Sequence, residues 1–156
     1  MPLRTVVIAG LVCLAGALAA HADDLMLAVD GKSDYQIVVP DEMPNPVIYR
    51  RLNEVALLVQ NVFKTNECSV PIVAEKERNP AKPGIYLGNT AFARANGVDV
   101  STLEGWGYVH KVVGKNVIIA GRDEPTLAKP ALGSRPPRNR VGTLKGVADF
   151  LRQYAG

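Results

Sequence analysis

The chain has 156 residues, of which 47% are hydrophobic, 21% are charged and only 6% are aromatic, with 14 glycines and 11 prolines. This composition excludes collagen-like, coiled-coil and strongly disordered chains, because the apolar fraction can fill a core and no low-complexity repeat appears. The formal net charge of +3 is too small to indicate a nucleic-acid partner without a basic stripe interleaved with aromatic residues. One packed domain is therefore expected.

The first 22 residues have the pattern of a secretory signal peptide. Arg4 supplies a positive charge, an almost unbroken apolar run covers residues 5–20, and Ala20-His21-Ala22 is a small-x-small cleavage triplet. A membrane anchor would need roughly 20 apolar residues, and here a histidine and two aspartates follow the run too soon. We expect cleavage after Ala22, which gives a mature domain over residues 23–156 that is secreted or periplasmic and has no membrane contact.

Export also determines what the cysteines can do. Cys13 lies in the expected signal peptide, so Cys68 is the sole thiol of the mature chain and an internal disulfide is excluded. A nucleophilic Cys68 would need a nearby base, and His110 is the only histidine after the cleavage point. We interpret Cys68 as a packed core residue, because small thiols are commonly buried. Its reactivity is left open.

The first predicted elements are a strand and a long helix. Strand-forming residues over 35–39 are followed by turn residues over 40–46. Apolar residues at helical spacing then predict an amphipathic helix over 47–64. Asn45 is the expected N-cap, with Pro46 at the first helical position.

Short elements follow in the middle of the chain. Strands are expected over 70–74 and 84–88, separated by a polar loop that contains proline. Asn89-Thr90 opens a short helix through Ala95, which Asn96-Gly97 can end.

The last third of the chain predicts a hairpin, a loop and a helix. Apolar runs over 108–113 and 117–120 are joined by Gly114-Lys115-Asn116, which is short enough for a β-hairpin. The segment from Glu124 to Arg140 is rich in proline and looks the least ordered. A second amphipathic helix is expected over 143–154.

This order of elements predicts an α/β (α+β) fold. A single mixed sheet of about five strands with two main amphipathic helices packed on it accommodates the series. No internal repeat stands out. Gly105-Trp106-Gly107 lies before a strand rather than between a strand and a helix, so it gives no support for nucleotide binding.

The last helix has more apolar residues than one buried face requires. They are Leu144, Val147, Phe150, Leu151 and Tyr154. We therefore expect an exposed apolar strip along this helix.

Histidine and cysteine chemistry finds little support. A zinc site of these ligands needs three or four of them, and the mature chain offers only His110 and Cys68, so no metal or other cofactor is expected. A Ser-His-acid triad would have to use His110, which alternates with Val109 and Lys111 on an expected strand and has no elbow serine to serve. A solvent-facing strand residue is the favoured interpretation of His110.

Paired carboxylates are the remaining catalytic option, because glycoside hydrolysis needs only two acids placed across a bond. Three acidic clusters exist: Asp41-Glu42, Glu75 with Glu77, and Asp123-Glu124. Solvated turn acids are the favoured interpretation of the first two. Asp123-Glu124 follows a buried strand, where α/β folds often place sites, but no other residue makes this pair specific. We assign no catalytic residue.

Two features favour binding. Trp106, flanked by two glycines, can expose an aromatic face for stacking on a sugar ring, although a lone tryptophan near a strand start more often closes the edge of a core. The basic segment 129–140 can hold an acidic sugar, a phosphate or a protein surface, and the favoured alternative is a solvated arm stiffened by proline. The candidate binding residues are Trp106, Tyr108, Arg122, Asp123, Arg135, Arg138 and Arg140.

Four motifs carry a resemblance to a known family. They are Gly84-Ile85-Tyr86-Leu87-Gly88, Gly105-Trp106-Gly107-Tyr108, the run from Asn116 to Asp123 and the run from Gly142 to Leu151. Together they resemble the small N-terminal α/β domain that precedes the catalytic barrel in β-hexosaminidases, α-glucuronidases and related exo-acting glycosidases. The resemblance covers approximately residues 35–154.

Each motif also has a structural reason. Gly88 can end a strand, and Gly121 lets the chain turn off the sheet. Thr143 is placed to cap the last helix. Gly146 lets that helix lie close to a neighbour.

The resemblance implies a non-catalytic protein, because the catalytic acids of these families belong to a barrel that does not follow here. The implied function is a secreted accessory domain of carbohydrate-active proteins, either truncated or stand-alone. The alternative is a small carbohydrate-binding or protein-interaction module that uses Trp106, Tyr108 and the segment 129–140. The implied partner is a carbohydrate or a glycosidase catalytic domain, and the oligomeric state is left open. One departure from the family is the longer basic, proline-rich segment before the last helix.

Overall fold

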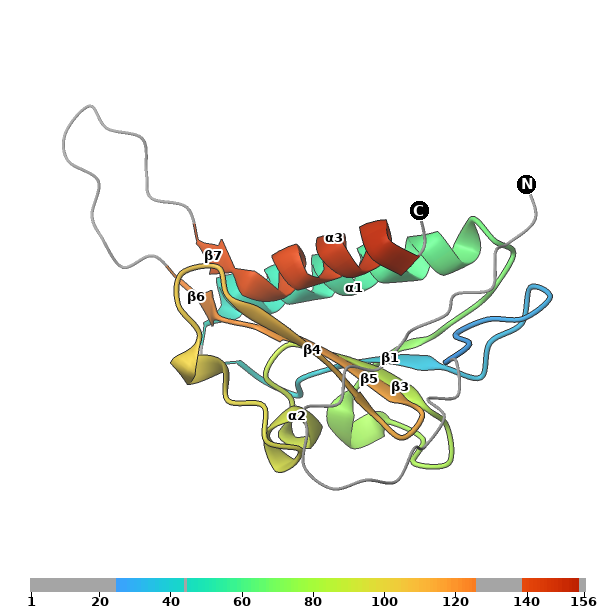
Figure 1. Cartoon of the computed structure of the whole chain (residues 1–156), viewed down its shortest axis with the longest axis horizontal. Helices are drawn as coiled ribbons and strands as arrows, with labels where there is room; N and C mark the ends of the chain where they lie inside the picture. Colours follow the sequence, from blue (N-terminus) through green and yellow to red (C-terminus); the bar gives the residue numbers. More distant parts are fainter. Residues whose placement is uncertain (1–24, 44, 126–138, 155–156) are drawn as a thin grey trace, which may run out of the picture.

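A five-stranded mixed sheet organises the domain (Figure 1). The computed structural model describes residues 25–43, 45–125 and 139–154. The strands of this sheet are β1 (Gln36–Val39), β2 (Ile72–Ala74), β3 (Gly84–Leu87), β4 (Tyr108–Val113) and β5 (Asn116–Gly121), in the order β2-β1-β3-β5-β4. β1 is parallel to β2 and β3, β3 is parallel to β5, and β4 is antiparallel to β5. The predicted α/β fold with one main mixed sheet is confirmed.

Helices cover both faces of the sheet. α1 (Pro46–Lys64) and α3 (Gly142–Tyr154) lie side by side on one face, and the short α2 (Ala91–Ala95) lies on the other (Figure 1). Two 3-10 turns, η1 (Glu75–Glu77) and η2 (Val100–Thr102), lie in the connections. The strands alternate accordingly, since Ile37 packs into the core under α1 and α3, whereas Val38 packs into the core on the α2 side.

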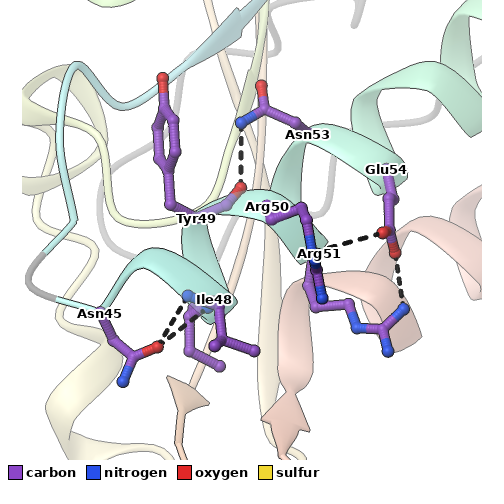
Figure 2. Close-up of polar contacts among 8 residues, drawn as sticks. Asn45, Ile48, Tyr49, Arg50, Arg51, Asn53 and Glu54 are labelled. Carbon is purple, nitrogen blue, oxygen red and sulfur yellow. Dashed lines mark hydrogen bonds and ion pairs between the residues drawn. The ribbon is translucent and has the colours of Figure 1, made fainter.

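The long helix begins as the sequence predicts. The side-chain carbonyl of Asn45 accepts hydrogen bonds from the amides of Val47 at 2.9 Å and Ile48 at 3.2 Å (Figure 2). Pro46 occupies the first helical position, where its missing amide hydrogen costs nothing. The buried face contains Ile48, Leu52, Val55, Ala56 and Val59. Figure 2 also shows Glu54 paired with both Arg50 and Arg51. All three side chains are exposed, and exposed ion pairs contribute little to stability.

The predicted hairpin and short helix are also confirmed. β4 and β5 close at the pair Val113–Asn116, and Gly114 supplies the positive φ of +57° that the tight turn needs. The hydroxyl of Thr90 caps α2 by accepting from the amide of Ala93 at 3.1 Å. Gly97, with φ of +74°, follows the end of this helix.

A tight turn before β1 was not predicted from the sequence. Val29 and Lys32 form an antiparallel bridge around Asp30-Gly31, whose φ angles of +49° and +70° are those of a tight hairpin turn. Leu27, just before this turn, is buried in the core. The Asp-Gly pair was the available signal.

The segment from Glu124 to Arg140 is more structured at its ends than predicted. β6 (Asp123–Glu124) and β7 (Arg140–Val141) pair antiparallel as a separate two-stranded sheet. Residues 126–138 lie outside the described residues. Two-residue strands are too short to show a period in the sequence, so this pairing had no local signal.

Two expectations for the last helix are wrong. Thr143 does not cap α3, because the helix begins at Gly142 and the Thr143 hydroxyl instead accepts from the amide of Gly121 at 3.0 Å. The exposed apolar strip is also absent over most of the helix. Val147 and Phe150 are buried, Leu151 and Tyr154 pack against the core, and only Leu144 is exposed among those five residues. The physical reason is that α3 contacts both α1 and the β4–β5 hairpin, so it buries a wider arc than one face.

Of the described helices, none combines the length and apolar character that crossing a membrane requires. The expected signal peptide lies outside the described residues.

The contact between β5 and α3 depends on glycine. A Cβ atom on Gly121 would lie 2.2 Å from the carbonyl carbon of Gly142 and 2.3 Å from the amide nitrogen of Thr143, both backbone atoms that cannot rotate away. Gly146 also lies close to the sheet, since a Cβ there would be 3.0 Å from the Cγ2 of Ile119. This second glycine confirms the expected close approach of the last helix.

We predict that Gly121→Ala lowers the free energy of unfolding by about 3 kcal/mol, because α3 must move off the sheet to admit one methyl group. The matched control is Gly105→Ala, where an added Cβ meets nothing within 4 Å and the φ of +55° costs only about 1–2 kcal/mol. Urea unfolding of both variants measures the difference. Equal losses would show that the close contact at Gly121 is unimportant.

Candidate functional site

Five of the seven candidate binding residues lie in the described part of the chain. Trp106 is in the turn between η2 and β4, and Tyr108 is the first residue of β4. Arg122 lies between β5 and β6, Asp123 begins β6, and Arg140 begins β7. Arg135 and Arg138 lie outside the described residues.

The turn that carries Trp106 is held from both sides. We call residues 103–107 the Trp106 loop. The amide of Gly107 donates to the carbonyl of Glu104 at 2.7 Å, which closes the turn, and the carbonyl of Gly107 accepts from the amide of Arg122 at 3.0 Å. Trp106 is 43% exposed. Trp106 therefore presents its indole to solvent rather than closing the edge of the core.

Arg122 braces this loop. Its Nη1 donates to the carbonyl of Leu103 at 2.9 Å, and its Nε donates to the carboxylate of Glu124 at 2.7 Å. The two side chains of this ion pair are 32% and 41% exposed, so the pair is in contact with solvent. Arg122 thus positions the Trp106 loop, and the charged groups of Arg122 and Glu124 lie beside that loop.

Tyr108 belongs to a polar cluster between β4 and α3. Its hydroxyl donates a hydrogen bond to the carboxylate of Asp149, which also pairs with Arg152 at 2.9 Å. The Lys145 ammonium lies 5.5 Å from the centre of the Tyr108 ring. The hydrogen bond raises the pKa of Tyr108 and lowers the pKa of Asp149, because it stabilises the phenol and the carboxylate together.

His110 is exposed on β4, in agreement with the interpretation of a solvent-facing strand residue. Its Nε2 lies 2.8 Å from the carbonyl of Gly146, and its ring meets the Phe150 ring edge-on. These contacts attach β4 to α3.

Asp123 is turned inward. Its carboxylate accepts from the amide of Thr143 at 2.9 Å and from the Thr143 hydroxyl at 2.6 Å. Burial raises the pKa of Asp123, and the hydrogen bonds from Thr143 and Gly142 oppose this effect only in part. The geometry gives Asp123 the capping role at α3 that the sequence analysis assigned to Thr143.

Two acids expected to be solvated turn residues instead hold neighbouring segments. Asp41 accepts from the amide of Lys76 at 2.8 Å. Glu75 accepts from the amides of Ala91 and Phe92, each at 2.7 Å, and so binds the first turn of α2. Their partners are distant in sequence, so no local pattern identified them.

The remaining candidate groups offer no reactive site. Cys68 is buried, and burial raises the pKa of its thiol, in keeping with a packing role. Within residues 25–43, 45–125 and 139–154, no three His, Cys, Asp or Glu side chains lie close enough to hold a metal ion.

Comparisons of the chain with protein families, with curated proteins and with solved structures found no match. The Trp106 loop with Arg122 is the best-defined candidate, and the Tyr108 cluster is the second. Asp149, Lys145 and Arg152 were missed by the sequence analysis, although the i, i+3 spacing of Asp149 and Arg152 was a signal for an ion pair.

We predict that the stability contributed by Asp123 depends on pH. The folded-state pKa is raised, so this contribution is fully present below the ordinary aspartate value of about 3.9 and is lost as pH rises through the folded-state pKa. Asp123→Asn removes the titration and replaces one of the two acceptor oxygens by an NH2 group, so only one of the two Thr143 donors keeps its acceptor, which costs about 1–2 kcal/mol. The stability advantage of the wild type over this variant should therefore be largest in acid and shrink towards neutral pH.

Urea unfolding at several pH values measures this advantage. Glu42→Gln, at an exposed acid, is the control and should show no such trend. A wild-type advantage that grows towards neutral pH would contradict the assignment.

Proposed function

We propose that the chain is a non-catalytic accessory domain of carbohydrate-active proteins that contacts a carbohydrate through Trp106. The observation that carries the proposal is the exposed indole on a loop fixed by Arg122. An aromatic ring presents an apolar face that packs against the C–H face of a sugar ring, and it loses little conformational entropy when its loop is already held.

The groups next to the indole suit a charged sugar. Arg122 can donate to a uronic acid carboxylate, and Glu124 can accept from an amino sugar. Both side chains are partly exposed and already paired, so a ligand would exchange one partner for another. Uronic acids and amino sugars are also the substrates of the glycosidases that the sequence resembles.

Two observations support the non-catalytic part of the proposal. The Asp123 carboxylate is occupied by Thr143, and the Glu124 carboxylate is occupied by Arg122. A glycosidase needs two acids that face the scissile bond, one with a raised pKa and one free carboxylate. The raised pKa of Asp123 meets the first requirement, but its carboxylate is bonded to Thr143, and Glu124 is paired with Arg122 rather than free. The confirmed α/β fold agrees with the domain that the resemblance implies. Secretion and a glycosidase catalytic domain as a partner are parts of the same proposal.

We predict that Trp106→Ala weakens binding of uronic acid or amino-sugar oligosaccharides by about two- to tenfold, as expected for loss of one aromatic contact. Isothermal titration calorimetry is the measurement, because the variant lacks the only tryptophan of the chain. Trp106→Phe should retain most of the affinity. Leu57→Ala, at a residue 48% exposed on α1, is the control for a general surface effect. Unchanged binding by Trp106→Ala, or no binding by the wild type, would refute the proposed contact.

We also predict no turnover of aryl hexosaminides or aryl glucuronides by the purified chain. The assay follows release of the aryl group, with Asp123→Asn and Glu124→Gln prepared in parallel. Turnover that either variant abolishes would overturn the non-catalytic assignment and make the acidic pair the catalytic centre.

A further inference from the structure

The outer edge of β4 carries backbone groups that the sheet leaves unused. The carbonyl of Gly107 accepts from Arg122, so the odd-numbered residues of β4 direct their amides and carbonyls towards β5. The carbonyl of Ile119, the residue opposite His110, accepts a hydrogen bond from the amide of Gly88 on the other side of β5. The amides and carbonyls of Tyr108, His110 and Val112 therefore point away from the sheet, and no residue in the described ranges bonds to them.

This edge lacks the usual protection against pairing. Proteins guard edge strands with short length, proline, bulges or lysine. The opposite edge, β2, has three residues and follows Pro71. β4 has six residues, pairs with β5 without a bulge and contains no proline. Its one lysine, Lys111, is folded back, with its ammonium 2.6 Å from the carbonyl of Asn96 beside α2.

We propose that β4 pairs antiparallel with β4 of a second copy of this chain, with His110 on the twofold axis. This pairing makes one continuous sheet from the two copies. It forms a symmetric dimer, in which the same surface serves on both sides. The inference is independent of carbohydrate binding.

The register follows from the three outward residues. With His110 opposite His110 of the second copy, Tyr108 lies opposite Val112 and Val112 opposite Tyr108, so all three outward residues form hydrogen-bonded pairs. A register shifted towards the hairpin turn would pair only two of these outward residues. It would also place Lys111 opposite Lys111 of the second copy, where the two positive charges repel each other. A register shifted in the opposite direction also pairs only two of the three outward residues. The central register therefore satisfies the most backbone groups.

The side chains fit the same register. Tyr108 opposite Val112 is an aromatic and β-branched pair of the kind that stabilises sheets. Val112 is 38% exposed and so has surface left to bury. Lys111 lies opposite Val109 of the second copy, so no like charges meet on that face.

The first experiment measures amide hydrogen exchange of the full chain by NMR at low and high protein concentration, with light scattering to report the mass. The amides of Tyr108, His110 and Val112 should exchange at least about tenfold more slowly at high concentration, when the dimer forms. The amides of Val109 and Lys111, which bond to β5, should not change. A chain that stays monomeric, or exchange at the three outward amides that is independent of concentration, would overturn the proposal.

The second experiment tests the register by cysteine cross-linking. In His110→Cys the two Cα atoms across the axis would be about 5.5 Å apart, within disulfide range. In the control, Lys111→Cys, they would be about 8 Å apart, beyond that range. Oxidation should cross-link His110→Cys and leave Lys111→Cys at the background level that the wild-type chain gives with its native cysteines. Equal cross-linking of both variants, or of neither, would refute this register.

A charge substitution separates pairing from folding. Val112→Lys should weaken dimerisation by about tenfold, because it adds a charge to the edge that the second copy must cover. Val29→Lys, at a residue 47% exposed in the turn before β1, should leave dimerisation unchanged. Thermal unfolding of both variants checks that the fold is intact. Wild-type dimerisation by folded Val112→Lys would overturn the proposal.

Discussion

The end of β5 and the start of α3 meet without side chains between them, and the rest of the domain is arranged around this contact. Gly121 and Gly142 allow the two backbones to touch. The Thr143 hydroxyl then accepts from the amide of Gly121 and donates to Asp123, so these polar groups, which the close approach buries, are hydrogen-bonded to each other. The consistency of sterics and hydrogen bonding explains why α3 sits directly on the sheet.

The same junction supports the candidate binding surface. Arg122 follows Gly121, its backbone amide bonds to Gly107, and its side chain bonds to Leu103. A Cβ atom on Gly142 would lie 2.5 Å from the carbonyl of Gly107, so α3 also approaches the Trp106 loop closely. The exposed indole is thereby carried on a rigid base rather than on a free loop, as recognition surfaces require.

The sequence predicted those parts of the fold that depend on neighbouring residues. The cap at Asn45, the face of α1, the turn at Gly114 and the end of α2 at Gly97 all follow from local backbone chemistry and periodicity. The errors lie where partners are far apart in the chain. Asp123 was expected to be a candidate ligand group and Thr143 a cap, but they bond to each other across 20 positions.

In the candidate site, too, local features could be predicted from the sequence and long-range contacts could not. Exposure of Trp106 could be expected from its two flanking glycines, but the support from Arg122 could not, because it runs over 19 positions to Leu103. Likewise, the burial of α3 depends on α1 and the hairpin, which no residue of the helix itself reveals. Long-range contacts decide both the breadth of a buried face and the stiffness of a loop.

The place of α3 in the chain has a consequence for how the domain forms. Val147 and Phe150 lie in the same core as Ile37, Ile85 and Ile119, which come from three different strands. Until α3 packs on the strands, the apolar surface of the sheet beside α1 is exposed to solvent. A nascent chain that has emerged only as far as β5 therefore has most of its strands but lacks a closed core. Completion of the fold waits for the last helix, and an incomplete chain remains open to chaperones and to proteases.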